Sequence, residues 1–274
     1  MYLSEINIYP VKSLSGISLK SSVVEECGLQ FDRRWMLVDE KNHFLTQREF
    51  PQMARFHIDL ENEGLNISFN RNSLAIQFQT NSEKTANVKI FSSRVKAKYY
   101  EDKVNDWFSE NLQTKCRLVL MTEESKRLVN PIYAIRKFKD TVSFADGYPF
   151  LLIGENSLAD LNGKLEKPLP MNRFRPNFVV SGSEAFAEDF WKKIKIGETI
   201  FHVVKPCARC VITTINQKTG EKDGKEPLKT LANYRTKNGK VLFGRYLIAE
   251  KEGKIIKVGD RVEILETANS ARTS

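Results

Sequence analysis

The sequence predicts a β-rich α+β protein, because strand periodicity and closely spaced turn residues dominate it and helical segments are few. Through the first 100 residues, short apolar runs recur between turn residues, and several of them alternate apolar with polar positions. Such alternation is typical of strands with one buried face, and the close spacing of the runs favours a barrel or a sandwich. Helices are therefore expected to be minor elements.

In the first half of the chain, strands are expected at 3–9, 35–38, 56–58, 65–69, 74–78 and 88–90. An amphipathic helix is predicted at 104–112, where Val104, Trp107, Phe108 and Leu112 fall on one face. Residues 123–145 are polar and lack clear periodicity, so they are expected to form a connection or a surface excursion.

In the second half, strands are expected at 149–154, 177–182, 195–204, 211–216, 242–248 and 261–265. A short helix is predicted at 156–162, with Asn156 or Ser157 as its N-cap, and another at 184–193. The small and polar residues from Thr267 to Ser274 are expected to form a frayed end.

Composition narrows the possible compartments and partners. The 274 residues carry a formal net charge of +9, which could serve nucleic acid, a membrane surface or an anionic small ligand. Lys and Arg are spread along the chain without a basic tail, so we do not expect a nucleic-acid partner. No apolar run reaches the roughly 18 residues of a spanning helix, and no signal peptide is evident. Four cysteines are too few for a disulfide framework, which favours a cytoplasmic protein without a membrane partner.

The stretch from Lys205 to Thr214 carries the strongest chemical signal. Cys207 and Cys210 stand three residues apart, with Arg209 between them and Lys205 nearby. Cationic neighbours stabilise the thiolate, which is the nucleophilic and metal-binding form of cysteine. These sulfurs are therefore candidate ligands or nucleophiles.

Several interpretations of this cysteine pair remain open. A structural zinc site needs further ligands, and the histidines lack the usual ligand spacing. A redox disulfide needs its first cysteine at a helix N-terminus, whereas 211–215 is predicted to be a strand. Two buried and inert cysteines are possible. So is a single thiolate that a turn presents to a cofactor with donor atoms of its own.

Cationic side chains stand beside turns in four places, at Lys12, at Arg33 and Arg34, at Arg173 and Arg175, and around the cysteines. Alternation should send Arg33 and Arg34 to opposite faces. Each alone could be a solvated arginine or one paired with an acid such as Asp32. Together they would suit phosphate, because guanidinium forks onto its oxygens and ammonium supplies a point charge. The cations and the thiolate thus suggest one anionic, metal-bearing ligand.

An ordered set of segments makes the chain recognisable. It resembles the MOSC proteins that carry an N-terminal MOSC β-barrel domain, such as the mitochondrial amidoxime-reducing component and the bacterial YcbX-like proteins. The segments are Tyr9-Pro10-Val11-Lys12-Ser13, Asp32 to Val38, Leu45-Thr46-Gln47-Arg48, Phe174-Arg175-Pro176-Asn177, Cys207-Ala208-Arg209-Cys210, Pro227 to Leu231, Tyr234-Arg235 and Leu242-Phe243-Gly244. The resemblance implies an N-terminal β-barrel-like domain at 1–120, a MOSC β-barrel domain with a few helices at 121–268, and a flexible tail at 269–274.

The resemblance also implies a molybdenum cofactor, a molybdopterin that holds an oxo-molybdenum centre. The family's protein ligand to the metal falls on Cys210, which would be the catalytic position. Its cofactor contacts fall on Lys12, Ser13, Arg33, Arg175, Asn177, Ala208 and Arg209. Relatives also touch the pterin where this chain has the loop with Tyr148, although the residues of that loop differ. Relatives often have a serine where this chain has Ala208.

The implied activity is reduction of N-hydroxylated compounds such as amidoximes, hydroxylamines or N-hydroxylated bases. YcbX-like proteins carry a C-terminal ferredoxin-type domain, whereas this sequence stops soon after Ile264 and has no cysteines beyond Cys210. We therefore expect electrons from a separate protein of ferredoxin, cytochrome b5 or flavoprotein type. The alternatives are a cofactor carrier or sulfur-transfer module, as in cofactor sulfurases, and nucleic-acid binding through the net charge.

Overall fold

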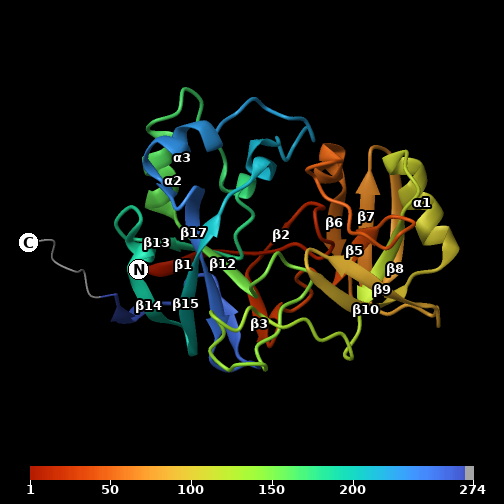
Figure 1. Cartoon of the computed structure of the whole chain (residues 1–274), viewed down its shortest axis with the longest axis horizontal. Coiled ribbons are helices and arrows are strands. Elements are labelled where there is room, and N and C mark those ends of the chain that lie inside the picture. The colour runs from red at the N-terminus through yellow and green to blue at the C-terminus, as the bar shows by residue number, and fades with distance from the viewer. Residues whose placement is uncertain (269–274) are drawn as a thin grey trace, which may run out of the picture.

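The computed structural model describes residues 1–268, and its elements gather in two halves that lie side by side (Figure 1). Strands make up most of the regular structure in both halves, with short helices at the periphery. The predicted β-rich α+β fold is confirmed. No helix in the described part of the chain is long and apolar enough to cross a membrane.

One half contains two small sheets and a helix. Its elements are β5 (Trp35–Val38), β6 (His57–Leu60), β7 (Gly64–Phe69), β8 (Asn72–Gln77), β9 (Thr85–Ile90), β10 (Ser93–Tyr99), α1 (Asp102–Leu112) and β11 (Arg117–Met121). One sheet has the order β5-β11-β10-β9, and the other is the meander β6-β7-β8. Val104, Phe108 and Leu112 of α1 are buried in one core with Trp35 and Phe56, which confirms the predicted amphipathic helix.

The other half is built on a nine-stranded sheet. Its strands are β1 (Tyr2–Ile8), β2 (Ile17–Leu19), β12 (Phe150–Gly154), β13 (Phe178–Ser181), β14 (Trp191–Ile196), β15 (Thr199–Ala208), β16 (Thr236–Lys237), β17 (Lys240–Ala249) and β19 (Val262–Thr267). The order is β19-β14-β15-β17-β12-β13-β1-β2, with β16 on β17. The first strand of the chain therefore belongs to a sheet made mainly by later residues.

The nine-stranded sheet curls around its own core. Tyr2 forms a β-bridge with Arg261, directly before β19, and the Leu3 amide donates to the Asp260 carbonyl at 2.9 Å. Phe150 and Phe178, on two neighbouring strands, pack inside the curve. The half-barrel that results holds β1, β12, β13, β15 and β17 in one rigid frame, and the candidate site lies at the ends of several of these strands.

Smaller elements complete the fold. They are β3 (Ser21–Glu25), β4 (Gly28–Leu29) and β18 (Ile255–Lys257), which form a third small sheet, helices α2 (Glu155–Asn162) and α3 (Leu228–Tyr234), and the 3-10 turns η1 (Pro51–Arg55), η2 (Met171–Arg173), η3 (Ala187–Asp189) and η4 (Val211–Thr214). Residues 122–149 contain no helix or strand, as predicted for a connection.

Two predicted elements are wrong, and the strand predicted at 195–204 is divided by a turn at 197–198 into the end of β14 and the start of β15. Residues 184–193 form the short turn η3 and the start of β14, because lysines alternate with isoleucines from Lys193 onward and the strand pairs with β15 and β19. The strand predicted at 211–216 is instead the 3-10 turn η4 at 211–214, followed by an isolated β-bridge of Ile215 with Lys222. In η4 the Thr213 and Thr214 hydroxyls donate to the carbonyls of Cys210 and Val211, at 3.0 and 2.8 Å. Such local side-chain bonds favour a turn over a strand.

The predicted cap of α2 is also wrong. Gly154 is the N-cap and no side chain caps the helix. Ser157 instead donates to the buried Glu188 carboxylate at 2.8 Å, and Asn156 donates to the Ser183 carbonyl at 2.6 Å. Thr267 ends β19, and residues 269–274 of the predicted tail lie outside the described residues.

Candidate functional site

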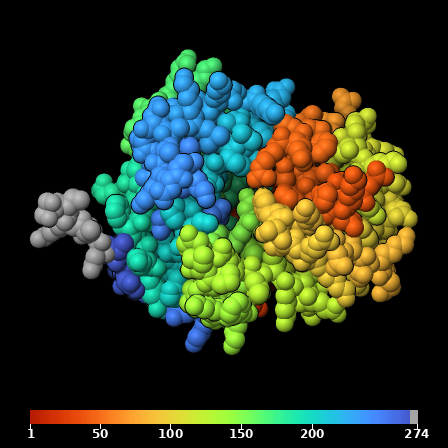
Figure 2. Space-filling view, viewed as in Figure 1, coloured from red at the N-terminus to blue at the C-terminus, as the bar shows by residue number. Residues whose placement is uncertain are grey.

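A pocket opens where the two halves meet, in a region where the molecular surface is hollowed (Figure 2). With its mouth it holds about 710 Å³ of empty space. Its lining includes every residue that the resemblance assigned to a cofactor, namely Lys12, Ser13, Arg33, Tyr148, Arg175, Asn177, Ala208, Arg209 and Cys210. Segments far apart in the sequence thus converge on one cavity, while their roles toward a ligand stay a prediction.

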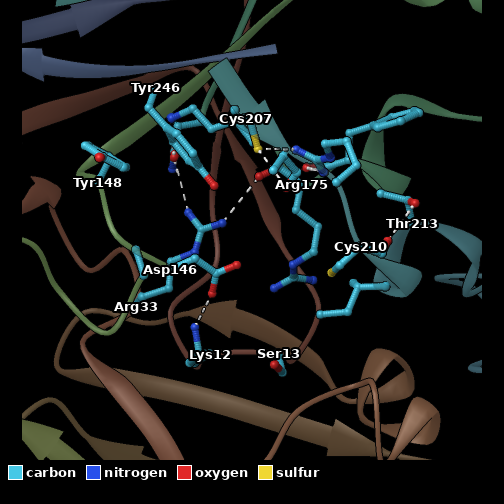
Figure 3. Close-up of a pocket in the computed structure, with 17 residues that line it drawn as sticks. Lys12, Ser13, Arg33, Asp146, Tyr148, Arg175, Cys207, Cys210, Thr213 and Tyr246 are labelled. Carbon is cyan, nitrogen blue, oxygen red and sulfur yellow. Dashed lines mark hydrogen bonds and ion pairs between the residues drawn. The ribbon is translucent and has the colours of Figure 1, made fainter. Parts of the chain in front are cut away.

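The two cysteines of the 207–210 turn have different surroundings. Cys207 is buried near the end of β15, where the Arg209 guanidinium donates to its sulfur at 2.9 Å. Cys210 is partly exposed at the start of η4, and its sulfur lies apart from that of Cys207 (Figure 3). In the described part of the chain its sulfur has one side-chain hydrogen-bond partner, Arg48 Nη2 at 3.7 Å, which comes from the other half of the molecule. Cys210 is therefore the sulfur that is available to a ligand.

This geometry bears on the open interpretations of the cysteine pair. Both cysteines are free thiols, and the one that begins a helical turn is the second, Cys210. A thioredoxin-type site would need the first cysteine there. Among residues 1–268, no group of three or more Cys, His, Asp or Glu side chains lies close enough to hold a metal ion. The arrangement suits a single thiolate ligand better than a zinc site or a redox disulfide.

Arg33 and Arg175 both pack against the ring of Tyr9. Their guanidinium carbons lie 4.2 and 4.1 Å from the centre of the Tyr9 ring. Arg33 donates to both oxygens of Asp32, at 2.9 and 2.7 Å, so it has a buried carboxylate partner. Arg175 makes one long hydrogen bond, at 3.4 Å, to Gln217. Burial lowers the pKa of Arg175 to about 10, although Tyr9 acts in the opposite direction.

The backbone at these positions is unusual. Ser13, Arg33 and Arg175 all have positive φ angles, of 68°, 51° and 54°. Side-chain-bearing residues adopt this conformation rarely, and it tends to occur at functional sites where surrounding structure enforces it. Gly16 contributes room, because a Cβ at that position would lie 2.5 Å from the Tyr9 ring. The sequence motifs therefore mark turns that aim side chains into the pocket.

Lys12 reaches the pocket between aromatic rings. Its ammonium lies 5.6 Å from the centre of Phe44 and 5.5 Å from that of Phe91, and donates to Asp146 at 2.6 Å. Burial lowers the pKa of Lys12 to about 8, even though Asp146 acts in the opposite direction. Desolvation works against the Asp146 charge, but Lys12 dominates and holds the pKa of that carboxyl well below its usual range. Both groups are charged at neutral pH.

Buried amides connect the pocket residues to one another. Gln47, which is fully buried, donates to the Ser13 carbonyl at 2.8 Å and exchanges hydrogen bonds with Gln217 at 3.2 and 2.9 Å. Asn177 accepts from Arg33 at 3.2 Å and donates to the Asn7 carbonyl at 3.1 Å. Turns from both halves are thereby held in register around the pocket.

Aromatic side chains and backbone form the remaining wall of the pocket. Tyr148 stacks on Tyr246, with ring centres 4.7 Å apart, and Figure 3 shows both at one end of the pocket. Ala208, which ends β15, contributes a methyl group and backbone. Arg209 donates to the Phe174 carbonyl at 2.6 Å, while its Nε is buried with no hydrogen-bond partner in the described part of the chain. Arg209 therefore holds the cysteine turn in position and has one N–H group, at Nε, that could donate to a ligand.

These residues fit an anionic ligand that carries a soft metal. Arg175 has no carboxylate partner within ion-pair distance among residues 1–268, and its lowered pKa reports a burial cost that an anion would offset. Phosphate is a suitable anion, because guanidinium binds its oxygens through two parallel hydrogen bonds. A thiolate at Cys210 would complete the coordination of a thiophilic metal. The pocket can thus bind a metal-bearing phosphate compound and orient it against one sulfur.

Several residues in or near the pocket were not assigned from the sequence. Asp146 and Arg48 lay inside motifs, but no local pattern indicated the Lys12 ion pair or the approach to Cys210. Arg127 is buried and donates to the carbonyls of Ser143 and Asp146, at 2.9 and 3.0 Å, which fixes the Asp146 loop. Arg34 does diverge from Arg33, toward Glu25 and Cys27, but through a turn rather than through strand alternation.

Comparison with known proteins gives consistent matches. A family model described as MOSC N-terminal beta barrel domain matches residues 1–115, and one described as MOSC domain matches residues 139–263. Mitochondrial amidoxime reducing component 2 of Rattus norvegicus is 37% identical over 95% of this chain and 82% of its own. Mitochondrial amidoxime-reducing component 1 of Homo sapiens is 30% identical over 96% and 82%. Molybdenum cofactor sulfurase of Oryza sativa subsp. japonica is 37% identical over 96% of this chain, which spans only 35% of that protein.

Proposed function

The chain belongs to the family of MOSC proteins with a MOSC N-terminal beta barrel domain, and on this premise we propose that it binds the molybdenum cofactor and reduces N-hydroxylated compounds. The amidoxime-reducing components support the reaction, because this chain aligns with most of their length. Amidoximes, hydroxylamines and N-hydroxylated bases are the substrate class that we propose.

One observation carries the proposal. The partly exposed sulfur of Cys210 lines the same pocket as Lys12, Arg33 and Arg175, which come from distant parts of the chain. The soft sulfur suits molybdenum. The cations other than Arg33, which is paired with Asp32, suit the phosphate of a pterin cofactor. A surface cluster of cations without the thiol, or a thiol without the cations, would not support it.

The protein supplies binding, orientation and electrostatics to such a cofactor. When bound, the cofactor supplies the electron pair that cleaves the N–O bond, so that R–NH–OH, two electrons and two protons give R–NH₂ and water. Cys210 would hold the metal, and Arg175 and Lys12 would hold the anionic end. Arg209 keeps the turn in position through Cys207 and the Phe174 carbonyl. We propose that a separate electron-transfer protein of ferredoxin, cytochrome b5 or flavoprotein type delivers the electrons.

A second candidate function is that of a cofactor carrier or sulfur-transfer module without reductase activity. The similarity to molybdenum cofactor sulfurases of rice and of Arabidopsis thaliana favours it, although the chain spans about a third of each, 35% in both cases. Both candidates need the cofactor in the same pocket. They differ in whether the loaded protein turns over an N-hydroxylated substrate.

Turnover of benzamidoxime by cofactor-loaded protein with a chemical electron donor separates the two candidates. The reductase proposal predicts stoichiometric benzamidine that depends on the cofactor, and loss of the product in Cys210→Ala. A loaded wild-type protein that forms no benzamidine with any electron source would contradict the reductase and leave the carrier. Cys116→Ala is a matched control, because that buried cysteine lies in the α1 core, away from the pocket.

A further inference from the structure

A second cleft adjoins the candidate site at its tyrosine end. With its open mouth it holds about 1000 Å³, and it shares Asp146, Tyr148, Ala208 and Tyr246 with the first pocket. The two cavities therefore have a common wall, and one elongated ligand could extend from one into the other. None of the residues assigned to the cofactor other than Tyr148 and Ala208 lines this cleft.

The cleft is basic and its cations lack partners. Lys205, Lys237 and Lys240 line it, and none of the three has an acidic side chain within ion-pair distance in the described part of the chain. Asp146 is the one carboxylate among the lining residues, and it already accepts from Lys12 at 2.6 Å. The lining thus carries an excess of positive charge that the protein itself does not neutralise.

Two of these lysines, Lys237 and Lys240, are exposed at the end of a hairpin, and Lys205 is partly buried. Lys237 and Lys240 are directly paired across the β16–β17 hairpin, whose turn is formed by Asn238 and Gly239 with φ angles of 50° and 70°. Like charges on opposed strand positions destabilise a hairpin. The Lys205 ammonium is oriented by tyrosine rings, at 4.8 Å from the centre of Tyr133 and 5.5 Å from that of Tyr148. An anion between the lysines would relieve this repulsion.

We propose that this cleft binds the phosphate group of the substrate, so that the protein prefers phosphorylated N-hydroxylated compounds, such as nucleoside monophosphates, over their neutral counterparts. The inference rests on the proposed reductase function. Three ammonium groups suit a phosphate monoester, which carries close to two negative charges at neutral pH and accepts several hydrogen bonds. The shared wall places this anchor beside the pocket in which the N-hydroxyl group reacts.

The test compares N4-hydroxycytidine 5′-monophosphate with N4-hydroxycytidine as substrates of the cofactor-loaded protein. We expect kcat/KM to favour the monophosphate by about tenfold, the effect of one charge-assisted hydrogen bond. In the double variant Lys237→Gln/Lys240→Gln this ratio falls to near one. Lys84→Gln/Lys103→Gln removes the same charge from exposed positions in the other half and keeps the ratio. No preference in the wild type, or a preference that survives in the double variant, overturns the proposal.

Equilibrium dialysis with cytidine 5′-monophosphate separates this proposal from its rivals without turnover. Binding to loaded protein that the double variant loses supports the cleft. Binding to cofactor-free protein that disappears on loading assigns the lysines to the phosphate of the cofactor and overturns the proposal. If the loaded protein reduces no N-hydroxylated compound yet binds the nucleotide through these lysines, the reductase function fails and the phosphate site stands.

Discussion

The turns at 31–35 and 173–177 look alike in sequence and differ in what they offer a ligand. Each presents an arginine with a positive φ angle to the same Tyr9 ring. Arg33 is neutralised by Asp32, which is fully buried and also accepts the Tyr9 amide at 2.8 Å. Arg175 has one long bond to an amide and a pKa lowered by burial to about 10. The guanidinium of the first turn is therefore paired within the fold, and that of the second turn is available to a ligand.

Removing the acid of the first turn should have the largest effect. Asp32→Ala leaves the Arg33 guanidinium and the Tyr9 amide without their buried acceptor. Breaking a buried ion pair costs about 3–5 kcal/mol, and we expect a loss of that size in the free energy of unfolding, measured by urea denaturation. Glu124→Gln breaks an exposed pair with Lys96 and should leave the free energy of unfolding close to that of the wild type. Equal losses in the two variants would contradict the assigned role of Asp32.

Removing the cation of the second turn should act on the ligand instead. Arg175→Met is expected to change the free energy of unfolding by less than about 1 kcal/mol, because it removes a buried cation that has no acid. Cofactor affinity should fall by about 10- to 100-fold, the equivalent of one charge-assisted hydrogen bond. Release of the fluorescent pterin on dilution measures this. Arg33→Met should instead lower the free energy of unfolding and have a smaller effect on cofactor affinity. A similar stability loss in both variants would contradict the distinction between the turns.

The charge of Lys12, and with it the expected cofactor affinity, depends on pH. Its folded pKa of about 8 lies below the ordinary value of 10.5, so the ammonium loses its proton as pH rises through about 8. Cofactor affinity should therefore be constant below pH 8 and fall above it, by at most about tenfold per pH unit. The unfolded chain holds that proton up to higher pH, so the cofactor-free protein should become more stable between about pH 8 and 10.5. Titration of pterin binding checks the first effect, and Lys12→Met should give a flat profile over this range.

The amide pair that joins the turns should have the smallest effect. Gln47→Leu removes the bonds to Ser13 and Gln217, and through Gln217 the support of Arg175. We expect cofactor affinity to fall by about fivefold, since an ordinary hydrogen bond contributes about 1 kcal/mol. Gln77→Leu, at an exposed position of β8, is the matched control. A loss in Gln47→Leu no larger than in the control would mean that the turns hold their positions independently.

The local sequence pattern predicted much of the fold. It failed where pairing between distant strands, or side-chain bonds to the nearby backbone, determine the structure. Alternation located β1 and β7, whose inward faces lie in a core, and a short apolar run located β5, which is buried on both faces. Trp191 was assigned to a helix by composition, while the lysine and isoleucine alternation that follows it indicated a strand. The segment after Cys210 is β-branched, yet the Thr213 and Thr214 hydroxyls fold it into a turn. Propensity is overridden there by side-chain bonds to the backbone.

The candidate site was predicted from an ordered set of motifs, and its ion pairs were not. The structure brings the residues named from those motifs, among them Lys12, Arg33 and Cys210, to one cavity. Nothing in the sequence indicated that Asp146 would meet Lys12 across 134 positions, or that Arg48 would reach the sulfur of Cys210. Such pairs depend on how the halves meet, which spacing along the chain does not encode.

We propose that the sulfur of Cys210, and not that of Cys207, holds molybdenum. The most direct test is the molybdenum and pterin content of wild type, Cys210→Ala and Cys207→Ala after expression in a host that makes the cofactor. We predict that wild type and Cys207→Ala retain both components, while Cys210→Ala retains little molybdenum. Equal molybdenum in Cys210→Ala and wild type, or loss confined to Cys207→Ala, would contradict the account.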